Sequence, residues 1–167
     1  MILATDVQYD ETNNRALAAG VVFKEWGIQH PEQEYTCPVQ GILPYEPGSF
    51  YKRELPCLLA LRALVLEPLD IIIVDGYVDL APDHPGLGRH LYNALGRRIA
   101  VVGVAKTHFE GSAGIHVLRG GSKSPIYVTA AGMDIRFAAY CVLGMHGPYR
   151  IPTLLKRADT LARGRFA

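Results

Sequence analysis

The stretch Leu69–Gly76, with the sequence LDIIIVDG, constrains the fold more than any other part of this chain. Its run of β-branched residues favours a strand, and the absence of polar alternation is typical of a strand buried on both faces. Such a strand lies in the middle of a sheet that helices cover on both sides. The sequence therefore predicts an α/β protein in which this stretch is a central strand.

Three stretches ahead of this strand also predict β-structure. They are Ile2–Tyr9, Ala16–Phe23 and Tyr35–Ile42, and the turn-forming residues 10–14 separate the first two. Strands joined in this way predict a three-stranded antiparallel meander.

A loop and a helix are predicted between the meander and the central strand. Two prolines and a glycine make Pro44–Gly48 a loop, and leucines at helical spacing predict a helix over Phe50–Leu66. Pro56 lies inside this range. We expect it in the first turn, or else a helix that begins later, because proline tolerates only the start of a helix.

The elements after the central strand alternate in type. A helix over Gly86–Arg98 and a buried strand over Ile99–Val104 would complete a parallel β-α-β unit. A hairpin is expected over Gly114–Ala130, followed by helices over Asp134–Leu143 and Thr153–Arg163. A meander followed by parallel βα units predicts a mixed sheet of the ribonuclease-H-like type. The competing Rossmann-type fold would place a glycine-rich loop after its first strand, where this chain has residues 10–14.

Length and composition predict one soluble domain over residues 1–167. The three cysteines lack metal-site spacing, so we expect reduced, packed thiols. The start of the chain has no basic leader and no apolar run reaches a membrane span, which predicts a cytoplasmic protein with no membrane contact.

Charge is divided unevenly along the chain. Residues 1–70 carry a net charge of −5, and residues 71–167 carry +6. The bases near the end of the chain would suit phosphate, but a solvated helix face is the more ordinary use of such residues. These bases are Arg150, Lys156, Arg157, Arg163 and Arg165.

Four acidic residues are candidates for a metal site. Asp75 ends the buried strand, where α/β sheets bind ligands, although Asp-Gly is also a common turn pair. Asp6 lies inside a strand, where a carboxylate is unfavourable, and a divalent cation would relieve repulsion between the two. Glu54 is also typical of an acid at a helix N-terminus, and Asp159 of an ion pair within a helix.

Several motifs, in order along the chain, resemble the endonuclease V family. They are Asp6–Tyr9 (DVQY), Pro44–Pro56 (PYEPGSFYKRELP), Val74–Gly76 (VDG), Gly103–Lys106 (GVAK), and Arg150–Pro152 with Arg157–Asp159 (RIP and RAD). The resemblance implies a ribonuclease-H-like fold and a nuclease that cuts a phosphodiester bond on the 3′ side of a deaminated base. It implies Mg²⁺, with Mn²⁺ as a substitute, and DNA or RNA containing inosine as the partner.

The resemblance also assigns roles by position. Asp6, Glu54, Asp75 and Asp159 match the family's acidic metal positions, and Lys106 matches a lysine beside the reacting phosphate. The substrate-binding positions implied are the wedge residue Tyr45 and the backbone at Gly48 and Gly76.

The chain departs from the family pattern at Tyr77, Ala81 and Met133, where family members usually carry histidine. These departures keep open a non-catalytic relative that binds nucleic acid. An unrelated small-molecule enzyme is the third possibility, but the glycines at 86 and 88 do not form a dinucleotide fingerprint. His90, which follows them, is interpreted as a packed histidine.

Overall fold

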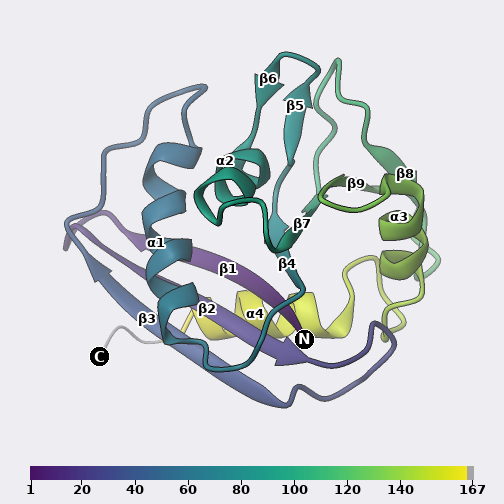
Figure 1. Ribbon diagram of the computed structural model, residues 1–167, viewed down its shortest axis with the longest axis horizontal. Coiled ribbons are helices and arrows are strands. Elements are labelled where there is room, and N and C mark those ends of the chain that lie inside the picture. The colour runs from purple at the N-terminus through teal and green to yellow at the C-terminus, as the bar shows by residue number, and fades with distance from the viewer. Residues whose placement is uncertain (165–167) are drawn as a thin grey trace.

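The computed structural model describes residues 1–164, and a seven-stranded mixed sheet forms its centre (Figure 1). The strand order is β3-β2-β1-β4-β7-β9-β8, and β5 and β6 form a separate small hairpin. The strands are β1 Ile2–Asp10, β2 Arg15–Phe23, β3 Gln33–Gln40, β4 Ile71–Asp75, β5 Asp79–Ala81, β6 His84–Pro85, β7 Ala100–Ala105, β8 Ile115–Val117 and β9 Ile126–Ala131. The helices are α1 Tyr51–Leu64, α2 Leu87–Ala94, α3 Ile135–Leu143 and α4 Thr153–Ala162.

Strand directions confirm the predicted mixed sheet. The strands β1, β2 and β3 pair antiparallel, whereas β1, β4 and β7 run parallel, and β9 and β8 form the predicted hairpin at the far edge. Ala4 on β1 pairs with Ile73 on β4, so two residues further along the parallel strands Asp6 lies level with Asp75. The register therefore brings two of the predicted site residues to the same edge of the sheet.

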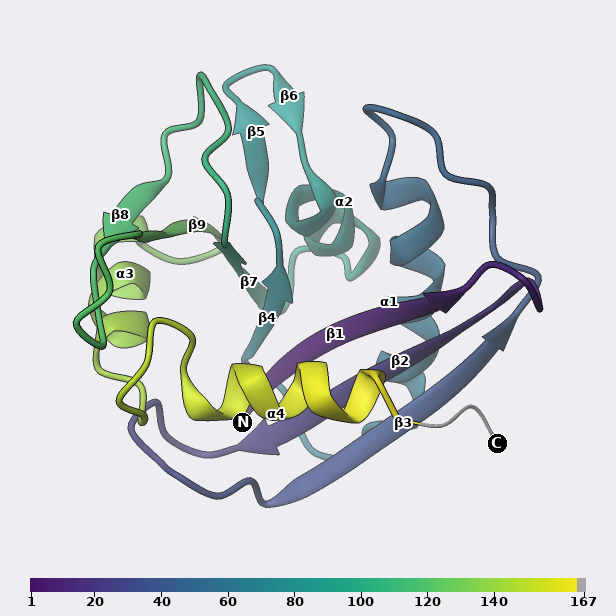
Figure 2. The same ribbon diagram turned by 180° about the vertical axis from the view of Figure 1, so that it is seen from behind.

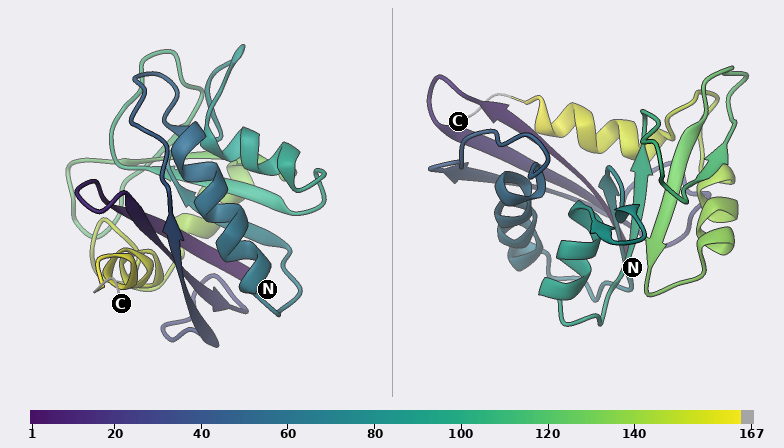
Figure 3. Two further views of the ribbon diagram at one scale, coloured as in Figure 1. Left: turned by 90° about the vertical axis from the view of Figure 1, so that its left-hand side faces the viewer. Right: turned by 90° about the horizontal axis from the view of Figure 1, so that it is seen from above.

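Two apolar cores explain the uninterrupted run in β4. Ile72 and Val74 pack into the core under α1 and α2, and Ile73 packs into the core under α3 and α4. Figure 3 shows the helices on the two sides of the sheet, and Figure 2 shows α4 lying across β1 and β2. Burial of each such side chain contributes about 2 kcal/mol, which favours β4 as the central strand.

Helix α1 differs from the prediction at Pro56. The helix begins at Tyr51, so Pro56 lies in its second turn rather than in its first, and the expectation was wrong. Proline has no N–H to donate to the carbonyl of Lys52, a loss that costs about 3 kcal/mol in a helix interior. The next turns bury Cys57, Leu58 and Leu61 in the core, and this packing holds the helix together.

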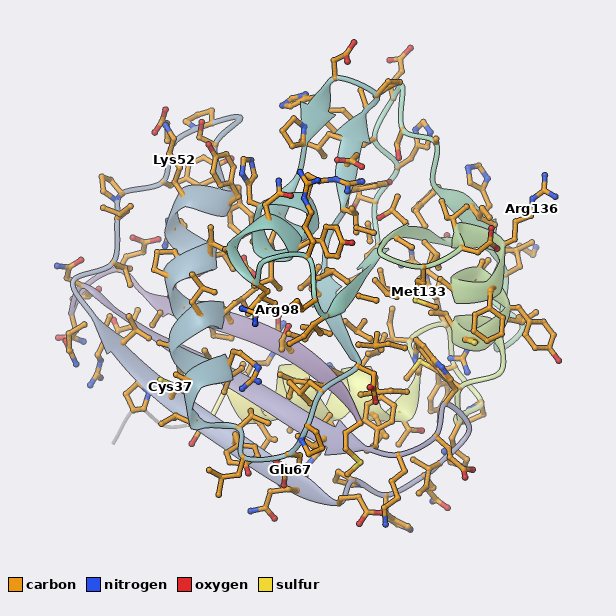
Figure 4. All side chains as sticks on the ribbon, viewed as in Figure 1. Cys37, Lys52, Glu67, Arg98, Met133 and Arg136 are labelled. Carbon is orange, nitrogen blue, oxygen red and sulfur yellow. The ribbon has the colours of Figure 1, made fainter. Side chains whose placement is uncertain are left out.

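The cysteines occupy the positions expected of small apolar residues. Cys37 on β3 is partly buried beside α1 (Figure 4). Cys57 and Cys141 are buried, and all three are free thiols. The β5–β6 hairpin was not predicted, because its strands are too short to show a pattern. Among residues 1–164, no helix combines the length and apolar character needed to cross a membrane.

Candidate active site

A cavity of about 290 Å³ opens at the carboxyl ends of the parallel strands. Strands β1 and β4 contribute Asp6 and Asp75 to its wall, the residue after β7 contributes Lys106, and α4 contributes Asp159. Residues from the two ends of the chain thus meet in one depression, and charged groups line much of it.

Asp6 is a buried carboxylate on β1. Its side chain is 6% exposed, and Gln8 donates a long hydrogen bond of 3.4 Å to it. Burial, and next the negative charge of Asp75, raise the pKa of Asp6 to about 6. The Thr5 hydroxyl donates to the carbonyl oxygen of Ile73 at 2.9 Å and holds β1 against β4 at this point.

Glu54 approaches the same region from α1. Its side chain is 4% exposed, and Tyr9 donates a hydrogen bond of 3.5 Å to it. Burial raises the pKa of Glu54 well above its usual range, and the charges of Asp6 and Asp75 add to the effect. Glu54 does not line the cavity, and it is buried near Asp6 and Asp75 rather than exposed as a helix-terminus acid would be.

Asp75 and Lys106 form an ion pair at the mouth of the cavity. The Lys106 ammonium donates to Asp75 Oδ2 at 2.6 Å, and the two side chains are 44% and 35% exposed. A predicted metal ligand and the predicted phosphate-binding lysine therefore lie in direct contact at neighbouring strand ends.

Asp159 reaches the cavity from α4, but both of its oxygens are occupied. Lys156 donates to one at 2.5 Å and Arg163 to the other at 2.7 Å. Burial raises the pKa of Asp159, but these two bonds outweigh it and hold the pKa below the usual value. The ion pair that the sequence offered as the alternative for Asp159 is present, and it lies within the candidate site.

Arg119, which no sequence motif selects, holds the loop that leads into α4. Its guanidinium is 8% exposed and donates to the carbonyl oxygens of Met145 at 2.5 Å and of Tyr149 at 2.6 Å. A buried cation needs such partners. Arg119 thereby holds the loop that leads into α4, the helix that carries Asp159.

The chemistry of these side chains fits a divalent cation. Asp6, Glu54 and Asp75 supply carboxylate oxygens, and Mg²⁺ prefers carboxylates supplemented by water and phosphate oxygens. Within residues 1–164, no three acidic, histidine or cysteine side chains converge closely enough to complete a binding site as they stand. Asp75 and Asp159 instead turn to the nearby cations, and both would have to exchange these partners for an ion.

A second cavity of about 220 Å³ adjoins the first at Asp75. Gly48 and Gly76 contribute to its wall with backbone φ angles of +78° and +144°, which other residues rarely adopt. Its remaining lining is largely aromatic and aliphatic: Phe50, Tyr51, Tyr77, Leu80, Pro85, Gly86 and Leu87. Tyr45, in the loop that leads to Gly48, is 62% exposed.

His90 has the packing role that was expected of it. Its ring stacks on Tyr51 with the centroids 3.6 Å apart and the planes 12° from parallel. The contact holds α2 against α1 beside the second cavity.

Comparison with known proteins decides the family. The endonuclease V family model matches residues 1–130. The chain belongs to the endonuclease V family. Endonuclease V from Streptomyces avermitilis is 29% identical over 184 residues, which cover 97% of this chain and 79% of that protein. The Streptomyces coelicolor protein is 28% identical, with coverage of 97% and 77%.

Solved endonuclease V structures share the fold. The crystal structure of the Streptomyces avermitilis protein matches with a TM-score of 0.76 at 28% identity, over 97% of this chain and 79% of that one. Ciona intestinalis endonuclease V, in complex with a 24mer DNA containing an inosine followed by a ribo-adenosine, matches with a TM-score of 0.80 at 21% identity, over 97% and 83%. The chain therefore has the ribonuclease-H-like fold and belongs to a family of nucleases.

The departures from the endonuclease V pattern have different surroundings. Tyr77 lines the second cavity, and its hydroxyl donates to the carbonyl of Thr107 at 2.8 Å. Ala81 ends β5, outside both cavities. Met133 packs against the core between β9 and α3 (Figure 4). Of the three, only Tyr77 is placed to affect the site directly.

The basic residues near the chain end are mostly engaged within the protein. Arg157 binds Glu34 on β3 at 2.7 Å, and Arg150 donates to the carbonyl oxygen of Pro125 at 2.7 Å. Lys156 and Arg163 bind Asp159, as described above. Arg165 lies outside the described residues. These side chains therefore serve internal contacts first, which weakens the interpretation of a free phosphate-binding patch.

Proposed function

We propose that this endonuclease V family member hydrolyses the phosphodiester bond on the 3′ side of an inosine in DNA or RNA. Mg²⁺, or Mn²⁺ in its place, would be held by Asp6, Glu54, Asp75 and Asp159. The observation that supports the proposal is the group formed by Asp6, Glu54 and Asp75 beside Lys106, in which burial, and next the charges of neighbouring carboxylates, raise the pKa of Asp6 and of Glu54.

In this proposal, Lys106 and Asp75 position the scissile phosphate. When bound, a divalent ion supplies a water of lowered pKa and a positive charge at the leaving oxygen. Lys106, released from Asp75, brings its ammonium to the phosphate oxygens as their charge develops. Lys106 and Asp75 are therefore expected to exchange partners when substrate and metal enter together.

The second cavity suits the base. It opens beside Asp75, and its wall at Gly48 and Gly76 has no side chain to keep the backbone away from a flat ring. An exposed aromatic at Tyr45 is available to fill the gap left in the stack, and would offset part of an unstacking cost of a few kcal/mol. We infer that the two cavities receive the base and its 3′ phosphate respectively.

The test compares the wild-type protein with Asp75→Asn on oligonucleotides that carry a single inosine, as DNA and as RNA, in Mg²⁺. We expect wild-type cleavage on the 3′ side of the inosine, no cleavage of the matching guanosine strand, and a loss of about 1,000-fold or more in the variant. Asp70→Asn is the matched control, because Asp70 lies at the other end of β4 and its side chain is 82% exposed.

Two outcomes would overturn the nuclease mechanism. A wild-type protein as inactive as Asp75→Asn would refute cleavage at this site. A wild-type protein that binds inosine strands without cutting them would instead support the non-catalytic relative.

A further inference from the structure

A strip of aromatic side chains leads away from the second cavity along the surface of the sheet. The strip adjoins Tyr77 in the wall of that cavity, because the Tyr77 ring centroid lies 6.4 Å from that of Tyr127 and 6.2 Å from that of Phe109. Tyr127 in turn lies 4.9 Å from His116 and 5.4 Å from His108. We call Phe109, Tyr127, His108 and His116 the aromatic strip.

Strand register places the strip on one face. Ala105 at the end of β7 pairs with Tyr127 on β9, and Tyr127 pairs with His116 on β8. The neighbours of Tyr127 and His116 along their strands pack into the core under α3, so these two side chains point to the opposite face, which also carries the second cavity.

The loop that carries the other two rings is fixed to the site. His108 and Phe109 follow Lys106 closely in the chain. The Tyr77 hydroxyl accepts a hydrogen bond from the Phe109 N–H at 3.1 Å and donates to the carbonyl of Thr107 at 2.8 Å. One buried tyrosine therefore joins the wall of the second cavity to the loop between Lys106 and the strip.

The strip faces solvent rather than the core. His108 and His116 are exposed, Phe109 is 37% exposed, and Tyr127 is half-buried. Flat rings and imidazoles in a row offer stacking surfaces to unpaired bases of any sequence, whereas paired bases in a duplex are already stacked. The strip also continues without a break from the cavity assigned to the extruded base, so a strand leaving that cavity would meet it.

We propose that the aromatic strip binds the bases of unpaired nucleotides next to the extruded inosine. The proposal rests on the proposed function for the position of the base. It assigns a strand-binding surface to residues of β8, β9 and the loop after β7, beyond the two cavities, and it predicts that binding strength depends on an unpaired flank of sufficient length.

The first experiment measures binding of fluorescent single strands by anisotropy, with the metal-free protein. His116→Ala is expected to weaken binding of a long unpaired strand about tenfold, the order expected for one stacked base. His116→Phe keeps a flat ring and is expected to retain most of the affinity. Tyr140→Ala is the control, because Tyr140 is an exposed aromatic, 73% exposed, on α3 behind the sheet.

The second experiment measures cleavage of inosine oligonucleotides whose 5′ and 3′ flanks are shortened in turn or paired with a complement. The His116→Ala variant should raise KM and leave kcat unchanged on long unpaired strands. Its defect should vanish when one flank is shortened or paired. Equal defects on all substrates, or His116→Phe failing as badly as His116→Ala, would overturn the proposal. A wild-type protein that does not cleave would defeat the proposed function, while the anisotropy comparison would still decide the role of the strip.

Discussion

The four acids of the candidate site fall into two pairs with opposite environments. Asp6 and Glu54, the inner carboxylates, are 6% and 4% exposed, and within residues 1–164 neither forms an ion pair. Asp75 and Asp159, the outer carboxylates, are both bound by lysine or arginine. Burial therefore makes the inner pair hold protons more tightly than ordinary carboxyls do, whereas the outer pair is already neutralised by cations.

These two environments have different consequences for the binding of a cation. Burial of carboxylates without partners is costly, and a nearby like charge adds to the cost. An ion that binds the inner carboxylates recovers this cost. For the outer carboxylates, the same ion must displace ammonium or guanidinium groups that are themselves well hydrated when released. Most of the driving force for metal binding should therefore come from the inner pair.

The largest effect should follow from Asp6→Asn. The variant keeps the shape of the side chain and removes the charge, so we expect metal-dependent cleavage to fall by about 1,000-fold or more. Addition of Mg²⁺ should raise the melting temperature of the wild type, because binding to the folded state alone stabilises it, but not that of the variant.

The matched control for this change is Asp10→Asn on the same strand. Asp10 binds Arg15 and Asn13 at the far end of β1, and these contacts lower its pKa. This variant should cleave normally and respond to Mg²⁺ as the wild type does. An Asp6→Asn protein that remained active, or still gained stability from Mg²⁺, would show that the inner pair is not the source of metal affinity.

The next effect is on stability as a function of pH without metal. The pKa of Asp6 is about 6 in the folded protein against 3.8 for an ordinary aspartate, so the protonated form favours folding. The contribution of Asp6 to the free energy of unfolding is fully present below about pH 4 and is lost as the pH rises through about 6. At about 1.4 kcal/mol for each pKa unit, the loss is about 3 kcal/mol.

Chemical denaturation of wild type and Asp6→Asn at several pH values measures this loss. The variant should be more stable than the wild type at pH 7, and the two should agree more closely near pH 4. A constant difference between them across this range would contradict the burial of an uncompensated charge at Asp6.

The sheet was predictable because its signal is local. A buried strand such as β4 shows its apolar run directly, and the hairpin of β8 and β9 shows its turn residues. The second-turn position of Pro56 was not predictable, because core packing of the rest of α1 outweighs the local preference of proline. Neither was the β5–β6 hairpin, which is too short to carry a pattern.

The candidate site was predictable as a set of residues but not as a set of contacts. Motif resemblance selected Asp6, Glu54 and Asp75, and register and burial bring them into one electrostatic group. The contact between Asp75 and Lys106 depends on two strand ends that are adjacent only in the folded sheet. The buried Arg119, which holds the entry to α4, likewise depends on a tertiary contact without a local signal.

The smallest effect should come from releasing an outer carboxylate. The double variant Lys156→Gln and Arg163→Gln removes both ion-pair partners of Asp159. The Lys156 and Arg163 side chains are each 63% exposed, so their replacement disturbs little other packing. Because the Asp159 side chain is only 9% exposed, removing both partners leaves a buried carboxylate unpaired, so we expect a loss of stability of about 1–3 kcal/mol and a gain in Mn²⁺ affinity of a few-fold by calorimetric titration. Arg157→Gln is the control, since it removes a charge from the same helix but frees Glu34 instead. An equal gain in affinity from Arg157→Gln would assign the effect to net charge alone and leave no special role for the release of Asp159.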